Sequence, residues 1–336
     1  MGDVYHLLAS QARFLPDRPA LTGPGRAPLT YARLLAQAEE VAARLNRGGV
    51  GRHDRVAIVL PNGPEMAAAF LSVAACATAA PLNPGFRAAE LEFYLSDLQA
   101  RALIVEAGKD SPARSVAHRL RIPIIELLPA GDSPAGLFTL ADPDPAPAIS
   151  PDWAQAEDIA LLLHTSGTTA RPKIVPLAHQ NICASARHVR CALELTPEDR
   201  CLNVMPLFHI HGLVGALLAS LAAGGSVFCS PGFYAPQFFS WMEEFRPTWY
   251  TAVPTIHQAV LARAAAHSET IARCPIRFIR SSSAPLPPQV MADLERVFQA
   301  PVIDRAPDSQ QSFAATLAQA RFSGSGRRRG SRRDWR

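Results

Sequence analysis

The chain has 336 residues, of which 48% are hydrophobic and 18% charged, so it can bury two or three cores and is not an intrinsically disordered protein. Its six widely spaced cysteines contain no Cys-x-x-Cys pair and indicate reduced, mostly buried thiols rather than a zinc cluster or a disulfide framework. Seven arginines and one aspartate give residues 321–336 a charge of +6, so the net charge of +4 leaves −2 for the rest of the chain. The body of the protein therefore gives no electrostatic reason to expect a nucleic-acid partner.

The N-terminal segment and two uncharged stretches bear on location. The first 15 residues lack the basic start of a secretory signal, which predicts a cytoplasmic protein. Residues 66–86 and 212–230 approach the length of a membrane span. Both are rich in alanine, glycine and serine, and the first contains two prolines, so we expect buried helices of a soluble core and no membrane span. The sequence indicates no particular oligomeric state.

Strand-like runs alternate with longer helical stretches along the chain, which predicts an α/β fold with parallel or mixed sheets flanked by helices. In chain order, the expected strands are 55–60, 102–106, 122–127, 159–165, 201–206, 226–230, 249–253 and 276–281. The expected helices include 31–47, 64–78, 87–98, 180–193, 211–223, 236–245 and 287–299. Several of these helices begin near a proline, which is favoured in the first turn.

Composition also predicts how the chain is divided. Residues 129–158 are rich in proline, alanine and aspartate, which is typical of an exposed connector. We therefore expect a first α/β subdomain over residues 1–150 and a second over residues 151–304. Beyond residue 304 the alternation stops, and residues 305–336 are expected to form a disordered tail rich in arginine, glycine and serine.

One loop carries the clearest chemical pattern. A strand expected to be buried leads into Thr165-Ser-Gly-Thr-Thr-Ala-Arg-Pro-Lys173. The backbone N–H groups and hydroxyls of such a loop can surround phosphate oxygens, and the lysine adds a positive charge for the same oxygens. The glycine spacing of the G-x-x-x-x-G-K-[ST] loop is absent, which argues against a P-loop NTPase. A plain turn would explain any shorter part of this segment, but not all nine positions in this order.

This order of residues resembles the T-S-G-T-T-G-x-P-K signature of the adenylate-forming, or AMP-binding, acyl-CoA synthetase superfamily. Ala170 stands where that family generally has glycine, and its methyl group would strain the loop if the position needs a positive φ. Residues 204–213, with His209 and His211, resemble the family's aromatic-and-histidine motif. Residues 279–286 resemble the turn that lies under the adenine and lines the acyl pocket.

Residues 205–211 and 249–257 are most similar to the oxalate-CoA ligase branch, which is related to the 4-coumarate-CoA ligases. His211 and the three serines at 281–283 would supply hydrogen-bond donors for the second charge of a small dicarboxylate. The alternative is a pocket for an apolar or aryl acid that happens to contain small polar residues.

The resemblance implies an ATP-dependent acid-CoA ligase that converts a carboxylic acid into acyl-AMP and then into a CoA thioester. It implies ATP, Mg²⁺ and CoA as cofactors or cosubstrates and a small carboxylic acid as partner, with no metal ligand among the residues quoted. The implied site residues are His209 and Lys173 for catalysis; Thr165, Ser166, Gly167, Thr168, Thr169, Lys173, Ser283, Ala284 and Pro285 for the nucleotide; and His209, His211, Ser282 and Ser283 for the acid.

The resemblance ends near Asp304, where the family's adenine-stacking and Mg-binding segment and its C-terminal lid find no match. This predicts a truncated or frame-shifted chain with impaired catalysis. One alternative is a non-catalytic nucleotide-binding remnant that acts through partner contacts. Another is a protein that binds RNA or a membrane surface through the arginine tail.

Overall fold

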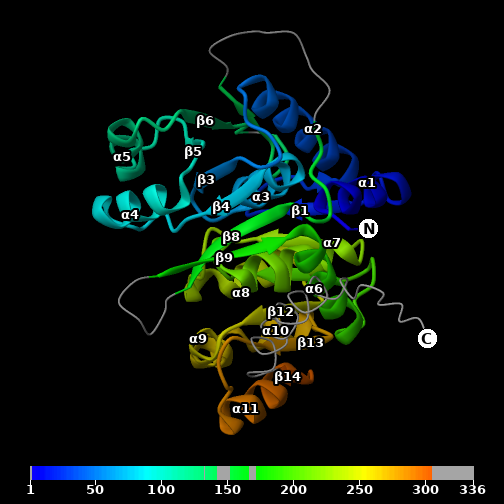
Figure 1. Cartoon of the computed structure of the whole chain (residues 1–336). Helices are drawn as coiled ribbons and strands as arrows, with labels where there is room; N and C mark the ends of the chain where they lie inside the picture. Colours follow the sequence, from blue (N-terminus) through cyan, green and yellow to red (C-terminus); the bar gives the residue numbers. More distant parts are fainter. Residues whose placement is uncertain (1, 132, 142–151, 166–171, 305–336) are drawn as a thin grey trace, which may run out of the picture.

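The computed structural model describes residues 2–131, 133–141, 152–165 and 172–304, and within this part the chain forms two seven-stranded sheets (Figure 1). Figure 1 shows β3 to β6 in the upper half, β12 to β14 in the lower half, and β1, β8 and β9 where the two sheets meet. The strands of both sheets are mostly parallel, with antiparallel pairs at the edges, so the predicted α/β class is confirmed.

Sheet 1 has the strand order β7-β6-β5-β3-β4-β8-β9. Its strands are β3 (Arg55–Val59), β4 (Thr78–Pro81), β5 (Ala102–Glu106), β6 (Ile124–Pro129), β7 (Phe138–Leu140), β8 (Ile159–Thr165) and β9 (Lys173–Ala178). The helices that lie before, between or directly after these strands in the chain are α1 (Val4–Phe14), α2 (Tyr31–Arg47), α3 (Pro64–Cys76), α4 (Ala88–Leu98), α5 (Pro112–Leu120) and α6 (His179–Ala192).

Sheet 2 has the strand order β14-β13-β12-β10-β11-β1-β2. Its strands are β1 (Pro19–Thr22), β2 (Leu29–Thr30), β10 (Arg200–Asn203), β11 (Ser226–Cys229), β12 (Trp249–Ala252), β13 (Phe278–Ser281) and β14 (Val302–Asp304). Its helices are η1 (His211–Leu218, a π-helix), α7 (Ala219–Ala222), η2 (Ala235–Gln237), α8 (Phe238–Phe245), α9 (Pro254–Ala264), η3 (Ala265–His267), α10 (Ser268–Arg273) and α11 (Pro288–Phe298).

Alternating side chains on the strands build three cores. On β3, Val56 and Ile58 join a large central cluster that also contains residues of sheet 2, whereas Ala57 and Val59 face α4 and α5. On β13, Phe278 joins the central cluster and Ile279 faces the cluster of α8, α9 and α11. Because successive side chains of a strand face opposite sides of the sheet, each sheet packs against a different layer on each face. The two sheets enclose a central apolar core.

The two uncharged stretches are mostly buried, and each contains a strand as well as a helix. Residues 66–86 contain most of α3 and all of β4, and residues 212–230 contain η1, α7 and β11. No helix in the described residues is long and apolar enough to cross a membrane. Five of the six cysteines are buried and Cys191 is exposed, as the sequence predicted, and none of the six is in a disulfide.

The sheets share segments across residue 150. Strands β1 and β2, from the start of the chain, pair with β11 in sheet 2, and β8 and β9 pair with β4 in sheet 1. Each sheet thus contains strands from both sides of residue 150, so the division into 1–150 and 151–304 does not coincide with the two sheets. As a division into domains it remains a proposal.

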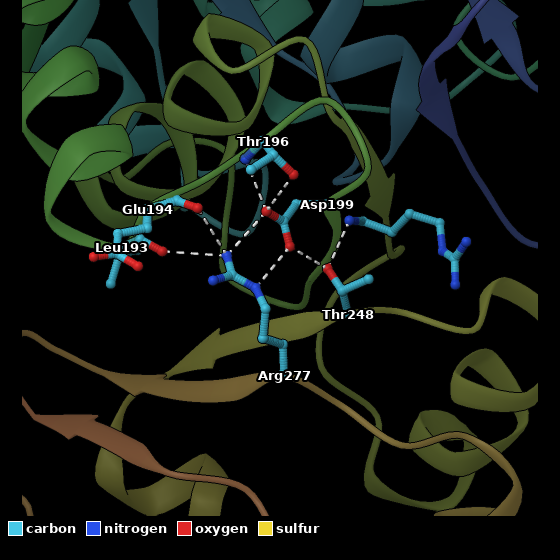
Figure 2. Close-up of polar contacts among 7 residues, drawn as sticks. Leu193, Glu194, Thr196, Asp199, Thr248 and Arg277 are labelled. Carbon is cyan, nitrogen blue, oxygen red and sulfur yellow. Dashed lines mark hydrogen bonds and ion pairs between the residues drawn. The ribbon is translucent and has the colours of Figure 1, made fainter.

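The N-terminal ends of three neighbouring strands in sheet 2 are joined by an ion pair (Figure 2). Asp199, before β10, accepts hydrogen bonds from Arg277 Nη2 at 2.9 Å and Nε at 3.1 Å, from the Thr248 hydroxyl at 2.7 Å and from the Thr196 backbone at 2.8 Å. Arg277 also donates to the carbonyls of Leu193 and Glu194. The loops before β10, β12 and β13 are therefore locked together at this end.

Candidate active site at the carboxyl ends of the strands

The opposite ends of the same strands bring polar side chains together. Strands β10, β12 and β13 are parallel neighbours, with Asn203 level with Thr251 and Thr251 level with Arg280. Side chains at the carboxyl ends of these strands therefore meet at one edge of sheet 2. In open α/β sheets this is the edge at which ligands bind.

His211 is the centre of this group. It begins η1, is 6% exposed, and lies with Nε2 2.6 Å from the Thr251 hydroxyl and Nδ1 3.1 Å from the Ser283 hydroxyl. The imidazole thus joins the end of β12 to the turn after β13. π-Helices are rare in proteins, and those that occur are often found at functional sites. The position of η1 at this edge agrees with that tendency.

The surroundings of His211 keep its ring neutral. Burial lowers its pKa from 6.5 to about 3, and the nearby charges of Arg280, His257 and His209 act in the same direction. A neutral imidazole has one donor and one acceptor nitrogen, so one of its two hydroxyl partners accepts a hydrogen bond and the other donates one. His211 can therefore hold and orient hydroxyl groups, but it does not supply a positive charge.

The turn after β13 carries the other predicted acid-site and nucleotide-site residues. Ser282 is buried, whereas Ser283, Ala284 and Pro285 are exposed. Ser283 has a φ of 75°, which is a strained conformation for a residue other than glycine. The structure thus places Ser283 beside His211 and Ser282 beside Arg280, and it leaves the surface of Ala284 and Pro285 open to a ligand.

His209 lies in the loop between β10 and η1 and is exposed. Its pKa is lowered by partial desolvation, and its ring is 4.6 Å from that of Phe208, centroid to centroid. Asn62, in the loop after β3, accepts a hydrogen bond from the Leu207 backbone at 2.7 Å and donates to the Ser230 carbonyl at 2.8 Å. A side chain from sheet 1 therefore fixes the loop of sheet 2 that carries His209.

The predicted phosphate loop can be placed only at its two ends. Ser166, Gly167, Thr168, Thr169, Ala170 and Arg171 lie outside the described residues. Thr165 ends β8 and pairs with Lys173, the first residue of β9, in an antiparallel hairpin. The loop therefore begins and ends at adjacent positions of one edge of sheet 1, and Lys173 is exposed there.

The strand that enters this loop has its own polar contact. His164, next to Thr165, lies with Nε2 3.1 Å from a carboxylate oxygen of Asp97 and packs edge-on against the ring of Tyr94. Desolvation lowers the pKa of His164, while Asp97 opposes that shift. These contacts join α4 to the end of β8 and so position the start of the loop.

Three polar residues of the site were not expected from the sequence, namely Asn203, Thr251 and Arg280. Asn203 donates to the Gly212 carbonyl and accepts from the Met205 backbone, so it shapes the start of the loop and of η1. Thr251 links two networks, because it contacts both His211 and Arg280. Arg280 is one of two arginines in the strand-like run 276–281, and only the structure shows that it is the buried one, because Arg277 is exposed.

The donors at this edge suit an anion better than a metal ion. Hydroxyls, a neutral imidazole and a guanidinium lie together there, and the guanidinium is a cation. Among the described residues, no group of three His, Cys, Asp or Glu side chains is placed to hold a metal ion.

Known proteins resemble the chain over most of its length. The family model described as AMP-binding enzyme matches residues 8–305. The oxalate–CoA ligase of Arabidopsis thaliana is 42% identical over 306 residues, covering 89% of this chain and 59% of that protein. The oxalate–CoA ligase of Saccharomyces cerevisiae is 35% identical over 292 residues, covering 80% of this chain and 53% of the relative.

Solved structures also resemble the chain over most of its length. The ATP-bound structure of MatB from Rhodopseudomonas palustris superposes with a TM-score of 0.77 at 26% identity, covering 90% of this chain and 59% of the other. The AMP complex of o-succinylbenzoate CoA synthetase from Bacillus subtilis gives 0.73, also at 26% identity, covering 88% of this chain and 71% of the other. The chain thus spans 53–59% of the length of the two curated relatives. With its two sheets and this family match, the chain belongs to the AMP-binding enzymes, the adenylate-forming acyl-CoA synthetase superfamily.

Proposed function

We propose that this chain supplies the ATP-binding and acid-binding part of an acid-CoA ligase that activates a small carboxylic acid. The observation that carries the proposal is the cluster of His211, Thr251 and Ser283 at the carboxyl edge of sheet 2. Two relatives named oxalate–CoA ligase support oxalate as the first acid to test. Another small acid or an aryl acid is the alternative.

In the proposed first step, a carboxylate oxygen of the acid attacks the α-phosphorus of ATP. The bond from that phosphorus to the bridging oxygen breaks, so acyl-AMP forms and pyrophosphate leaves. The protein's work in such a step is to orient two anions and to offset their charge. Lys173 and the hydroxyls and N–H groups of residues 165–169 would hold the phosphates, and His209 would lie beside the carboxylate.

Other residues would hold the rest of the two substrates. Ser283, Ala284 and Pro285 would contact the nucleotide from their exposed turn, and His211, Ser282 and Ser283 would hold the acid. Mg²⁺ bound to ATP would offset part of the phosphate charge. In the second step, the sulfur of CoA would attack the acyl carbon, AMP would leave, and the thiol proton would be lost to solvent.

ATP–pyrophosphate exchange tests the first step on this chain. We expect exchange in the presence of Mg²⁺ and one acid from a panel of oxalate, 4-coumarate and a medium-chain fatty acid. Lys173→Ala removes the positive charge at the end of β9 and should lower exchange by about 100-fold. Lys109→Ala is the matched control, because Lys109 is an exposed lysine in the segment after β5 and should leave exchange unchanged.

The same assay separates the proposal from the alternative of a nucleotide-binding remnant. A folded chain that binds ATP but shows no exchange with any acid would favour the remnant, which would then act through partner contacts. Exchange that is the same in Lys173→Ala and in the native chain would contradict the role of the loop.

A further inference from the structure

A cavity of about 390 Å³ lies at the N-terminal ends of three neighbouring strands of sheet 1. These strands, β3, β5 and β6, are parallel to one another, and β8 runs parallel to them through β4. Because Thr165 ends β8, the phosphate loop starts at the opposite edge of the sheet. The side chains that give the cavity its charge and polarity are His53, Asp54, Arg55, Gln99, Arg101 and Arg121.

The three arginines of this cavity come from neighbouring positions of the sheet edge. Arg55 is the first residue of β3, Arg101 directly precedes β5, and Arg121 follows α5 in the short segment before β6. The Arg101 backbone N–H donates to the Arg55 carbonyl at 2.8 Å, so these two residues are direct neighbours. Adjacent strands lie about 4.8 Å apart, so the arginines are distributed over about 10 Å of the edge.

The side chains of these arginines differ in their contacts. Arg55 Nη1 donates to the carbonyl of Leu98, at the end of α4, at 2.9 Å. Arg101 and Arg121 are exposed, and no acid in the described part of the chain forms an ion pair with either of them. Two positive charges therefore line the cavity without a carboxylate partner.

The acids close to the cavity already have other partners. Asp54 is the acid in its lining, and one of its carboxylate oxygens accepts a hydrogen bond from the Gly51 backbone at 2.8 Å. Asp158 lies with a carboxylate oxygen 2.8 Å from Nε of Arg52. These acids therefore stabilise the turn before β3 and do not neutralise the two arginines.

The corresponding end of sheet 2 shows how an arginine is held when it serves the fold. There Arg277 donates to Asp199 at 2.9 Å and 3.1 Å (Figure 2). In sheet 1, Arg101 and Arg121 are like charges near one edge, and like charges repel. An anion between them would offset that repulsion, so the cavity favours an anionic ligand.

The number and position of the arginines indicate the class of anion. Guanidinium groups form paired, charge-assisted hydrogen bonds with phosphate oxygens. A single phosphate can contact arginines of two adjacent strands, whereas a diphosphate has a second phosphate group that can reach the third strand. The volume of about 390 Å³ leaves room for a ligand of this size.

We propose that the cavity at the N-terminal ends of β3, β5 and β6 binds a diphosphate group through Arg101 and Arg121, with Arg55 beside them. Free pyrophosphate and nucleoside diphosphates both carry this group. The site is separate from the phosphate loop, and the proposal does not depend on the ligase function. The competing explanation is that the arginines only offset the negative ends of the α4 and α5 dipoles.

Protection from chemical modification locates the site on the native full chain. Phenylglyoxal modifies exposed arginine side chains, and a bound anion shields those that it contacts. At ten times its Kd, pyrophosphate should slow modification of Arg101 and Arg121 by at least about fivefold, as measured by mass spectrometry of peptides. Arg263, an exposed arginine on α9, is the control and should react at an unchanged rate. ADP is tested in parallel, and the ligand with the lower Kd identifies the source of the diphosphate.

Isothermal titration calorimetry then measures the contribution of each arginine. Pyrophosphate is titrated without Mg²⁺ into the native chain and into Lys173→Ala, which lacks the lysine charge of the phosphate loop. In the Lys173→Ala chain, adding Arg101→Met or Arg121→Met should weaken binding by about tenfold. Adding Arg263→Met, the matched control, should leave the Kd unchanged.

The two measurements distinguish this site from the phosphate loop and from a structural role. Absence of protection of both arginines by pyrophosphate and by ADP would overturn the proposal, and this result does not depend on the folding of any variant. The same Kd in the folded Arg101→Met and Arg121→Met chains as in the control would also overturn it. Loss of all pyrophosphate binding in Lys173→Ala alone would assign the anion to the phosphate loop and reject the second site.

Discussion

The two ends of sheet 2 each contain an arginine, and the contacts of the two arginines differ. At the N-terminal ends, Arg277 and Asp199 form an ion pair with two N–H···O contacts, and the remaining carboxylate contacts come from Thr196 and Thr248 (Figure 2). At the carboxyl ends, three residues further along the same chain segment, Arg280 contacts hydroxyls at 3.4 Å. One end is therefore a structural network centred on an ion pair, and at the other end the arginine contacts side chains of the candidate site.

A cavity of about 450 Å³ at the N-terminal end illustrates this difference. It is lined by Thr196, Glu198, Asp199, Thr248, Pro275, Ile276 and Arg277. Both oxygens of Asp199 and both guanidinium nitrogens that reach it already have partners within the protein. The polar groups of this cavity thus serve the fold, and size alone does not identify a ligand site.

The largest expected effect is a loss of stability in mild acid, and it arises from neutral buried histidines. The pKa values of His179, His211 and His257 are lowered from 6.5 to about 4, about 3 and about 4, with burial as the main cause of each. The unfolded chain therefore binds more protons than the folded chain below pH 6.5. Stability is complete above that pH and falls as the pH drops towards the folded values, by about 2 kcal/mol for each histidine at pH 5.

Urea unfolding at pH 7 and pH 5 measures this loss, and His211→Gln assigns part of it to the carboxyl end of sheet 2. In this variant the unfolding free energy should depend less steeply on pH, because the unfolded chain then takes up about one proton fewer relative to the folded chain. His188→Gln, at an exposed position on α6, should retain the native dependence. An unchanged slope in His211→Gln would mean that this histidine does not titrate as its surroundings indicate.

The N-terminal ends should respond to a change of charge at Asp199. Asp199→Asn leaves Arg277 without its carboxylate and alters the contacts of Thr196 and Thr248. We expect a loss of about 1 to 2 kcal/mol in unfolding free energy, because Asp199 is buried but the Arg277 side chain is 42% exposed. Ligand binding should change little, because the pair lies at the opposite ends of the strands from the site. Urea unfolding and ATP binding are the two measurements.

Asp110→Asn, at an exposed position before α5, is the control for Asp199→Asn. A stability change as small as that of the control would show that the Arg277 ion pair contributes little. A loss of ATP binding in a folded Asp199→Asn chain would contradict the separation of the two ends.

Regular elements with strong patterns could be predicted, and contacts that depend on register could not. The bounds of β5, β8 and α2 agree with the expected ranges because apolar runs end sharply there. Strand β4 was missed, since Thr-Ala-Ala-Pro follows an alanine-rich helix and has low β-propensity. The pairing of β1 with β11 joins residues some 200 positions apart, which no local pattern indicates.

The site shows the same limit. His209, His211 and the serines could be found because they lie in continuous motifs. Thr251 and Arg280 join them only through the register of β12 and β13. The left-handed backbone of Ser283 was also invisible in the sequence, because nothing in a run of three serines indicates a positive φ.

The smallest expected effect concerns that strained residue and gives the finest test of the carboxyl end. Ser283→Gly removes the hydroxyl that lies 3.1 Å from Nδ1 of His211 and also removes the Cβ that makes a φ of 75° unfavourable. The lost hydrogen bond costs about 1 kcal/mol and the relief of strain returns about the same amount, so the unfolding free energy should change by less than about 0.5 kcal/mol.

Binding should separate from stability in this variant. If the strain at Ser283 is kept because its hydroxyl orients His211 towards the acid, Ser283→Gly should weaken oxalate binding by about threefold to tenfold while the chain stays as stable as the native one. Ser283→Ala keeps the strain and loses the hydroxyl, so it should weaken both stability and binding. Unchanged oxalate binding in both variants would show that the contact between Ser283 and His211 belongs to the fold, as the Asp199 network does at the other end of the sheet.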